Sequence, residues 1–410
     1  MIGCEPVNEP TTEEGGTTTV DDSNIASVNK VTNYYGTIYE VILKDGNRMY
    51  FGIKNDSEVR MGNWSYFYDG SEYEYEKYAE YEYKGHLVIP EKITLEGKEY
   101  TITELYDMSH ADIGYYDVAN TTLLSVVVPN TIKKITYRCF EACTALKSVI
   151  LSENLTHIGR YAFRKTIVED ESNWENGILY YDGYLIESDE DVVSGDLKIK
   201  EGTKLVASHA FFYSSDEITS ITFPEGLKYI NTYAFFGCEG VSSITLPGSM
   251  LSIEENGFGA CSALSKVKFL GTIDQWVDIN FYDRYANPIV NSHNLYINNE
   301  LVVNAKTVEA DSIKQYVFDG CNSLKSIEVG SKVEFVSPIA FLNCYNLSSV
   351  KWNAKNASYP KAYNYNESSP FYNLREQILS FTFGDEVEYI PTALCYGMTN
   401  IKEITIPKNV

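Results

Sequence analysis

One sequence motif recurs along most of this chain at a nearly constant spacing. Residues 146–163 read Leu-x-x-Val-x-Leu and then Leu-x-x-Ile-Gly-x-x-Ala-Phe, and the closing phenylalanine returns every 23 or 24 residues, with gaps of 48 and 60 where insertions lie. Its positions are Phe140, Phe163, Phe211, Phe235, Phe258, Phe318 and Phe341. A fixed period of this length predicts a solenoid, in which each unit buries its apolar face only against its neighbours.

Each unit contains a short predicted strand with apolar residues at relative positions 1, 4 and 6, the last example being Ile401, Ile404 and Ile406. Positions 4 and 6 have the period-2 spacing that points side chains to one face of a strand, so stacked units form a parallel ladder. A second apolar pair, such as Ile253 and Phe258, brings the chain back on the other side. There we expect irregular or short helical segments.

Five cysteines keep the same register, each three residues after a repeat phenylalanine: Cys143, Cys238, Cys261, Cys321 and Cys344. A cysteine at a fixed repeat position is most simply a small apolar residue in an internal column. We therefore expect reduced, buried thiols. Cys139 and Cys143 resemble a metal pair in their spacing, but Cys139 occupies the position that other units fill with alanine.

Charge and hydropathy restrict the partners. The chain has 57 Asp and Glu against 33 Lys and Arg, a net charge of −24. This balance disfavours nucleic acid and anionic lipid headgroups, since both need a basic face. No apolar run approaches the ~18 residues needed to cross a bilayer. The 34 tyrosines suit half-buried positions and recognition surfaces, although most are expected to fill strand positions.

The N-terminal segment, residues 1–29, carries two prolines, a threonine run and six carboxylates but no Lys or Arg. This composition predicts a disordered acidic tether. Cys4 follows a small residue and precedes this polar spacer, which resembles the end of a bacterial lipoprotein signal peptide. The resemblance implies a lipid attached to Cys4 and an outer-membrane lipoprotein at the surface of a Gram-negative bacterium, in mature or trimmed form. An incidental cysteine near an ordinary start is the alternative.

The repeat resembles the BspA-like leucine-rich repeats of bacterial surface proteins, whose consensus runs L-x-x-I-x-I-P and then V-x-x-I-G-x-x-A-F-x-x-C. The match covers about residues 85–410, and period, Pro, Phe and Cys all agree. It implies an α/β-type, mainly β solenoid of leucine-rich repeats with a parallel strand ladder on the concave face. The Gly of the I-G step survives only at Gly159, which implies irregular turns.

The same resemblance makes Gly85–Tyr106 the first unit. Residues 30–84 are then a β-hairpin N-terminal cap that protects the first strand edge. Two insertions interrupt the repeat, near 166–196 and 271–305. Asn176-Gly177 and Asp182-Gly183 predict small hairpins in the first, and a strand over residues 295–297 is predicted in the second. The last unit stops partway, so we expect a cut at that end.

No catalytic constellation is indicated. The histidines are scattered and no pair has zinc-ligand spacing: His86, His110, His157, His209 and His293. There is no Gly-rich phosphate loop and no nucleophile elbow. The acidic runs 169–171 and 187–191 lack the alternating ligands of a calcium loop and are interpreted as solvated insertions. We predict no enzyme activity, no cofactor and no metal.

The segment Tyr66–Tyr83 is the most distinctive sequence outside the repeat. It alternates Glu and Tyr over residues 72–76, so one strand face would carry rings and the other carboxylates. Exposed rings could anchor a ligand, whereas the competing interpretation is a cap hairpin that buries its Tyr face. The candidate ligand contacts are aromatic: Tyr73, Tyr75, Tyr78, Tyr81, Trp276 and Tyr282.

Our leading hypothesis is a non-enzymatic surface protein for binding and adhesion that recognises a host or microbial macromolecule. The family resemblance implies extracellular-matrix proteins as the ligand class. The second hypothesis is a glycan-binding accessory surface lipoprotein, and the third is a periplasmic structural scaffold. In each case we expect a monomer that meets a protein or glycan ligand, touches the membrane only through its lipid anchor and binds no nucleic acid.

Overall fold

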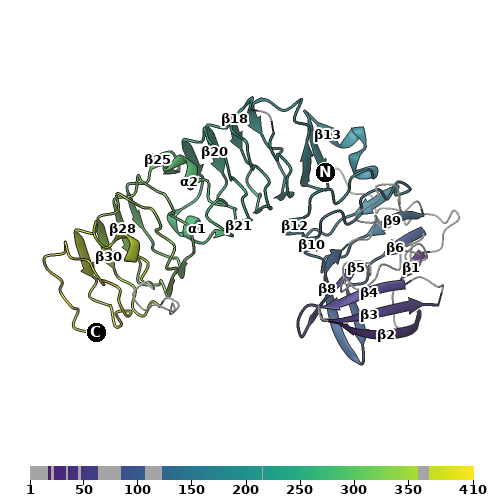
Figure 1. Cartoon of the computed structure of the whole chain (residues 1–410), viewed down its shortest axis with the longest axis horizontal. Helices are drawn as coiled ribbons and strands as arrows, with labels where there is room; N and C mark the ends of the chain where they lie inside the picture. The colour runs from purple at the N-terminus through teal and green to yellow at the C-terminus, as the bar shows by residue number, and fades with distance from the viewer. Residues whose placement is uncertain are drawn as a thin grey trace, which may run out of the picture. The chain divides into compact units, whose positions relative to one another are not determined.

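The computed structural model describes residues 17–19, 23–33, 36–44, 48–62, 85–106, 122–214, 216–358 and 369–410. The chain divides between Trp174 and Glu175 into two compact units, unit 1 and unit 2. Parallel strands from successive repeats build both units (Figure 1). The mainly β solenoid predicted from the repeat is confirmed.

In unit 2 the predicted strands of successive repeats pair in parallel along what we call the long-strand side. The first sheet there contains β16 (Gly195–Lys198), β18 (Ile218–Thr222), β20 (Ser243–Leu246), β22 (Lys266–Phe269) and β24 (Leu295–Ile297), with β25 (Glu300–Leu301) antiparallel to β24. The second contains β26 (Asn304–Lys306), β28 (Ser326–Val329), β30 (Ser349–Trp352) and β31 (Ser380–Phe383). Ile221, Ile244 and Val267 are direct register partners, so position 4 of the repeat forms one buried column.

The opposite side of each repeat carries a second parallel ladder, which we call the short-strand side. Its strands are β17 (Leu205–Val206), β19 (Tyr229–Ile230), β21 (Ser252–Ile253), β23 (Asn280–Phe281), β27 (Ser312–Ile313) and β29 (Phe335–Val336). In Figure 1 the labels β18 and β20 mark the long-strand side of unit 2, and β21 marks the short-strand side. The expectation of irregular or short helical segments here is wrong, because Val206, Ile230 and Ile253 stack in register and extended backbone lets each side chain enter the core.

The turns that follow the short strands also hydrogen-bond to one another. The amides of Tyr233, Phe235 and Gly237 each donate to a carbonyl of the next repeat at 2.9 Å, and the amides between them donate to carbonyls three residues back in the same turn. This alternation places left-handed backbone two residues before and two residues after the phenylalanine, with φ of 56° at Tyr233 and 76° at Gly237. The turns are therefore regular, although the loss of the I-G glycine in most repeats had predicted irregular ones. That glycine is not at one of the left-handed positions, so the turn does not depend on it.

The repeat phenylalanines stack in the core of each unit. Ring centroids lie 4.9 Å apart for Phe211 and Phe235, and 5.3 Å apart for Phe235 and Phe258, with nearly parallel planes. After the second insertion the column continues through Phe341 to Phe371, whose rings are 5.3 Å apart. Phe371 thus fills the repeat position although it lies 30 residues beyond Phe341. Such a column buries large apolar surface at every step, which supplies most of the stability of a stacked repeat.

The first insertion forms a hairpin, as predicted. Strands β14 (Ile178–Tyr181) and β15 (Tyr184–Ser188) pair antiparallel around Asp182-Gly183, where both residues have positive φ. It follows two 3-10 turns over residues 167–169 and 171–173 and the two-residue strand β13 (Trp174–Glu175). The second insertion contains α1 (Ile273–Val277), α2 (Ile289–Ser292) and the predicted strand β24. Another 3-10 turn covers Tyr372–Leu374.

Unit 1 joins an antiparallel meander to the first repeats. The meander contains β2 (Ile25–Asn33), β3 (Gly36–Leu43), β4 (Arg48–Ile53) and β5 (Glu58–Gly62). Strand β5 pairs in parallel with β8 (Lys98–Tyr106), which continues into β10 (Lys134–Ile135) and β12 (His157–Ile158), while β7 (Lys92–Leu95) is antiparallel to β8. The cap therefore has four strands where a hairpin was predicted, and it continues the short-strand ladder. The other sheet contains β1 (Thr17–Thr19), β6 (Gly85–Val88), β9 (Leu123–Val127) and β11 (Ser148–Ile150).

Two sequence predictions fail at the ends of the described chain. Strand β2 begins at Ile25 and β1 covers Thr17–Thr19, both inside the predicted tether 1–29. An edge strand needs only backbone pairing, so a polar composition does not exclude it. The pattern at 401–406 forms no strand, and Ile404 and Ile406 are exposed. Within the residues that the structure covers, no helix is long and apolar enough to cross a membrane.

Candidate ligand-binding surface

The turns of the repeats present a row of variable residues beside the buried phenylalanine column. We call this row the turn edge; it consists of the residues two before, one after and two after each repeat phenylalanine. At five of these six positions in two adjacent repeats of unit 2 the side chains are aromatic, and the sixth residue is Gly237. The resulting aromatic cluster contains His209, Phe212, Tyr213, Tyr233 and Phe236.

The rings of the aromatic cluster contact one another across the two repeats. Phe212 and Phe236 stack with centroids 5.7 Å apart, and Tyr213 meets both rings edge-on at 4.6 and 5.4 Å. His209 stacks on Tyr233 at 5.2 Å. Tyr213 is 57% exposed, whereas Phe212, Tyr233 and Phe236 are half-buried. A group of rings fixed by mutual packing and open to solvent loses little entropy when a ligand binds.

Glycines in the next repeat make room for these rings. A Cβ atom on Gly237 would lie 2.4 Å from Tyr213 Cδ1, and one on Gly259 would lie 2.7 Å from Phe236 Cδ2. Both distances are shorter than real Cβ contacts allow. The two rings therefore lie directly against backbone, which sets the position of the aromatic cluster on the turn edge.

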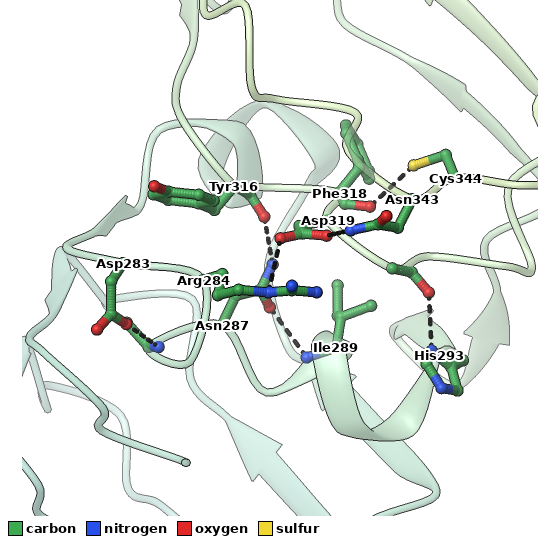
Figure 2. Close-up of polar contacts among 12 residues, drawn as sticks. Asp283, Arg284, Asn287, Ile289, His293, Tyr316, Phe318, Asp319, Asn343 and Cys344 are labelled. Atoms are coloured by element: carbon green, nitrogen blue, oxygen red, sulfur yellow. Dashed lines mark hydrogen bonds and ion pairs between the residues drawn. The ribbon is translucent and has the colours of Figure 1, made fainter. Parts of the chain in front are cut away.

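A polar cluster follows at the second insertion, where the ladders of unit 2 are interrupted. The short-strand sheet ends at β23 and another begins at β27, and the long-strand side likewise divides between β25 and β26. Side chains of the insertion bond to backbone across this gap (Figure 2). Asn287 Nδ2 donates to the Tyr316 carbonyl at 2.5 Å, and Asp274 Oδ1 accepts the amides of residues 308, 309 and 310 at 2.8–3.1 Å. We call this set of side-chain bonds the splice.

Asp319 is the ionisable group at the centre of Figure 2, with a fully buried side chain. Its Oδ1 accepts from Asn343 Nδ2 at 2.7 Å, and its Oδ2 lies 3.5 Å from Arg284 Nε, an ion-pair distance longer than a hydrogen bond. Burial raises the pKa of this carboxyl, while the Asn343 hydrogen bond and the Arg284 charge act in the opposite direction. This buried, paired carboxylate joins two repeats.

The structure separates the six candidate ligand contacts predicted from sequence. Tyr282 is 62% exposed and remains a candidate. Trp276 is wrong as a surface contact, because it is fully buried and its indole Nε1 donates to the Val317 carbonyl at 2.7 Å as part of the splice. The other four candidates and Cys4, the predicted lipid-attachment residue, lie outside the described residues: Tyr73, Tyr75, Tyr78, Tyr81 and Cys4.

The predicted cysteine column is buried, and its thiols are reduced: Cys143, Cys238, Cys261, Cys321 and Cys344. Beyond packing, three of them donate to the carbonyl of the phenylalanine in the preceding repeat: Cys238 to Phe211, Cys261 to Phe235, and Cys344 to Phe318, at 2.9–3.3 Å. Burial raises the pKa of Cys261 to about 12. These thiols are neutral hydrogen-bond donors between repeats.

The BspA type leucine rich repeat region is the family model that matches this chain. Its six copies cover residues 106–185, 204–310 and 294–410, more than half of the sequence. The chain belongs to the BspA-type leucine-rich repeat family. No curated protein sequence matches it.

Solved structures of bacterial leucine-rich repeat proteins resemble this BspA-type chain at low identity. The pneumococcal vaccine antigen PcpA is 18% identical, with 88% of this chain and 95% of that chain covered and a TM-score of 0.31. A leucine-rich repeat protein from Eubacterium ventriosum is 16% identical, with 90% and 97% covered and a TM-score of 0.34. A leucine rich cell surface protein from Faecalibacterium prausnitzii is 16% identical, with 92% and 94% covered and a TM-score of 0.25.

BspA-type proteins are typically non-enzymatic binding proteins. In the part of the chain that the structure describes, no group of three His, Cys, Asp or Glu side chains is placed to hold a metal ion. The aromatic cluster was not predicted from sequence. A signal for it was present, because Phe211-Phe212-Tyr213 and Phe235-Phe236 place consecutive aromatic residues at the same position of two adjacent repeats.

Proposed function

We propose that this BspA-type protein is a non-enzymatic binding and adhesion protein of the bacterial surface, and that it meets its ligand on the turn edge of unit 2. The observation that supports this proposal is the aromatic cluster around Tyr213. Exposed rings clustered on a rigid scaffold are the residues that most often dominate the energy of a protein interface. The cluster also occupies adjacent repeats, so the stacked backbone holds it in one geometry.

The proposed ligand is a host or microbial macromolecule, first of all a protein of the extracellular matrix. The test measures saturable binding of the full chain to immobilised matrix proteins, with Tyr213→Ser and Phe212→Ser as variants. Loss of an aromatic anchor costs roughly 2 kcal/mol or more, which weakens binding about 30-fold. Tyr389→Ser is the matched control, because Tyr389 is 48% exposed on unit 2 but lies outside the cluster. Equal binding by Tyr213→Ser and Tyr389→Ser would refute the site.

A glycan-binding accessory lipoprotein is the second candidate function. It is favoured by the packing of the Tyr213 ring against Gly237 while more than half of the residue stays exposed, since such a ring offers a face on which a sugar can stack. A glycan array probed with the full chain distinguishes the two functions. Glycan binding that is lost in Tyr213→Ser supports the second, and matrix binding without any glycan response supports the first. Glycan binding lost instead in Tyr73→Ala/Tyr75→Ala would move the site to residues 66–83.

We also propose that the protein is attached to the outer membrane through a lipid on Cys4. A small residue before Cys4 and the acidic segment behind it support this attachment. Metabolic labelling with a fatty-acid analogue tests it, and labelling that persists in Cys4→Ser would contradict it. We expect a monomer in solution, to be checked by light scattering.

A further inference from the structure

Several tyrosine rings of this chain have a cation of the same chain over one face. Three of these pairs have the guanidinium carbon 4.4–5.5 Å from the ring centroid: Arg164 with Tyr161, Arg284 with Tyr285, and Arg375 with Tyr372. The face of an aromatic ring carries negative potential, so it attracts a positively charged group. These tyrosine rings are therefore already occupied by a cation from within the protein.

The aromatic cluster has no such cation over three of its rings. Tyr213, Tyr233 and Phe236 contact other rings, and no Lys or Arg among the described residues lies over them. Tyr213 is 57% exposed, although one side of its ring lies against the Gly237 backbone. The other side of this ring is consequently open to a cation that a ligand supplies.

Two carboxylates lie beside these rings. The Glu255 carbonyl accepts the Tyr233 amide at 2.9 Å, so the two residues are neighbours across adjacent repeats. Glu239 lies two residues after Gly237, the glycine whose backbone supports the Tyr213 ring. Within the ranges that the structure describes, neither carboxylate forms an ion pair or a hydrogen bond. Both negative charges are thus left for a group outside the fold to balance.

The rest of this region is also acidic. Residues 205–262, which contain the aromatic cluster and both carboxylates, hold six Asp and Glu against one Lys. That lysine, Lys228, directly precedes β19 on the short-strand side and is not part of the turn edge. Exposed charges act over ~8 Å at physiological salt, so a net negative region attracts a cation to the rings within it.

We propose that the aromatic cluster captures an arginine or lysine side chain from a basic segment of a protein ligand. This inference rests on the proposed function, because it names the chemical group that the turn edge of unit 2 selects. The charged head of the side chain lies over the Tyr213 ring, and Glu239 and Glu255 balance its charge. A neutral sugar would gain nothing from the carboxylates, and an anionic ligand would be repelled by them.

The test uses a synthetic peptide in which arginines alternate with glycine and serine, and the same peptide with citrulline in place of every arginine. Citrulline keeps the planar shape of the side chain and removes its charge. Binding of each peptide to the full chain is measured by fluorescence anisotropy at low and at high salt. We expect the arginine peptide to bind at least about tenfold more tightly at low salt, and this ratio should shrink at high salt because screening weakens the carboxylates.

Variants locate the selectivity on the aromatic cluster. Tyr213→Ser keeps the net charge of the chain but should weaken binding of the arginine peptide about fivefold or more. Tyr213→Phe should preserve binding, because the ring face remains, and Tyr389→Ser is again the matched control. Glu255→Gln should weaken binding at low salt. Glu300→Gln removes an exposed carboxylate from β25 on the long-strand side and should have no effect.

The outcomes separate a built site from general charge attraction. Equal binding of the two peptides, or binding of neither, overturns the inference. Equal affinity of Tyr213→Ser and the wild type for the arginine peptide also overturns it, since the net charge of −24 would then attract the peptide without the cluster. Failure of the proposed function is distinguishable. Matrix-protein binding that is lost in Tyr213→Ser, with no preference between the peptides, overturns this inference alone. Arginine selectivity that depends on Tyr213, in a chain that binds no matrix protein, supports this inference and refutes the matrix ligand.

Discussion

Replacing Gly237 by alanine separates the steric support of the aromatic cluster from ordinary backbone strain. Gly237 has φ +76°, and its Cβ would lie 2.4 Å from Tyr213 Cδ1. Left-handed backbone costs a residue with a Cβ about 1–2 kcal/mol wherever it occurs. At this position the Tyr213 ring must also move, and it then loses edge contacts with Phe212 and Phe236. Each such ring pair contributes about 0.5–1.5 kcal/mol, so we expect an additional loss of ~1–3 kcal/mol.

The matched control is Gly202→Ala. Gly202 lies in the same unit with φ +86°, and a Cβ added there would meet no atom within 4 Å. It therefore carries the backbone penalty without the collision. Urea unfolding of the two variants and the wild type, followed by far-UV and near-UV circular dichroism, gives the difference in unfolding free energy and the change in aromatic packing.

We expect Gly237→Ala to unfold at lower urea than Gly202→Ala and to lose near-UV signal at zero denaturant. Ligand binding through the aromatic cluster should fall in Gly237→Ala only. Stabilities that agree within about 0.5 kcal/mol, the usual scale of a neutral surface substitution, together with an unchanged near-UV spectrum, would show that the Tyr213 ring does not depend on the glycine.

Three further outcomes follow from the core and the splice. Phe235→Ala should cost about 3–5 kcal/mol of unfolding free energy in urea titrations, because the ring is fully buried between two others of the column. The Cys261 thiol has its pKa raised from 9.0 to about 12, so it should resist alkylation at pH 8 until urea unfolds the chain. Because the folded pKa lies above the unfolded one, the neutral thiol contributes to folding stability in full below pH 9, and this contribution declines as pH rises toward 12. Burial also raises the pKa of Asp319 above 3.8, so ionisation of this carboxyl opposes folding, and folding stability should rise as pH falls through the folded pKa. Asp319→Asn should flatten this pH dependence of the thermal unfolding midpoint. A pH profile that is the same in the variant and the wild type would contradict this role of Asp319.

The period in the sequence was sufficient to predict the solenoid, the register of its long strands and the buried cysteine column. Each of these features depends on one residue type that recurs at one spacing, and stacking of the repeats brings the equivalent residues of neighbouring repeats into contact. The short-strand ladder was harder to predict, because two residues per repeat, such as Tyr229 and Ile230, are too few to show alternation. Its signal was nevertheless present in the apolar residue five before each phenylalanine.

The candidate sites were predicted less well, for a physical reason. The candidate ligand contacts were aromatic residues that the repeat pattern does not explain. Lying outside the pattern does not distinguish an aromatic ring on the surface from one that fills an irregular part of the core. Trp276 shows the difference: the insertion needs a large side chain with a donor that reaches the Val317 carbonyl, and a bond across 41 residues leaves no periodic mark.

The splice has a consequence for how unit 2 resists force. Backbone bonds between repeats run along the stacking direction, so tension between the ends acts on one interface after another. From β16 to β23 each interface is closed by ladders on both strand sides. At the second insertion, side chains such as Asn287 and Asp274 join the repeats together with backbone bonds such as that from the Lys314 amide to the Val277 carbonyl. Under tension we expect the interface at the second insertion to rupture before the interfaces between β16 and β23.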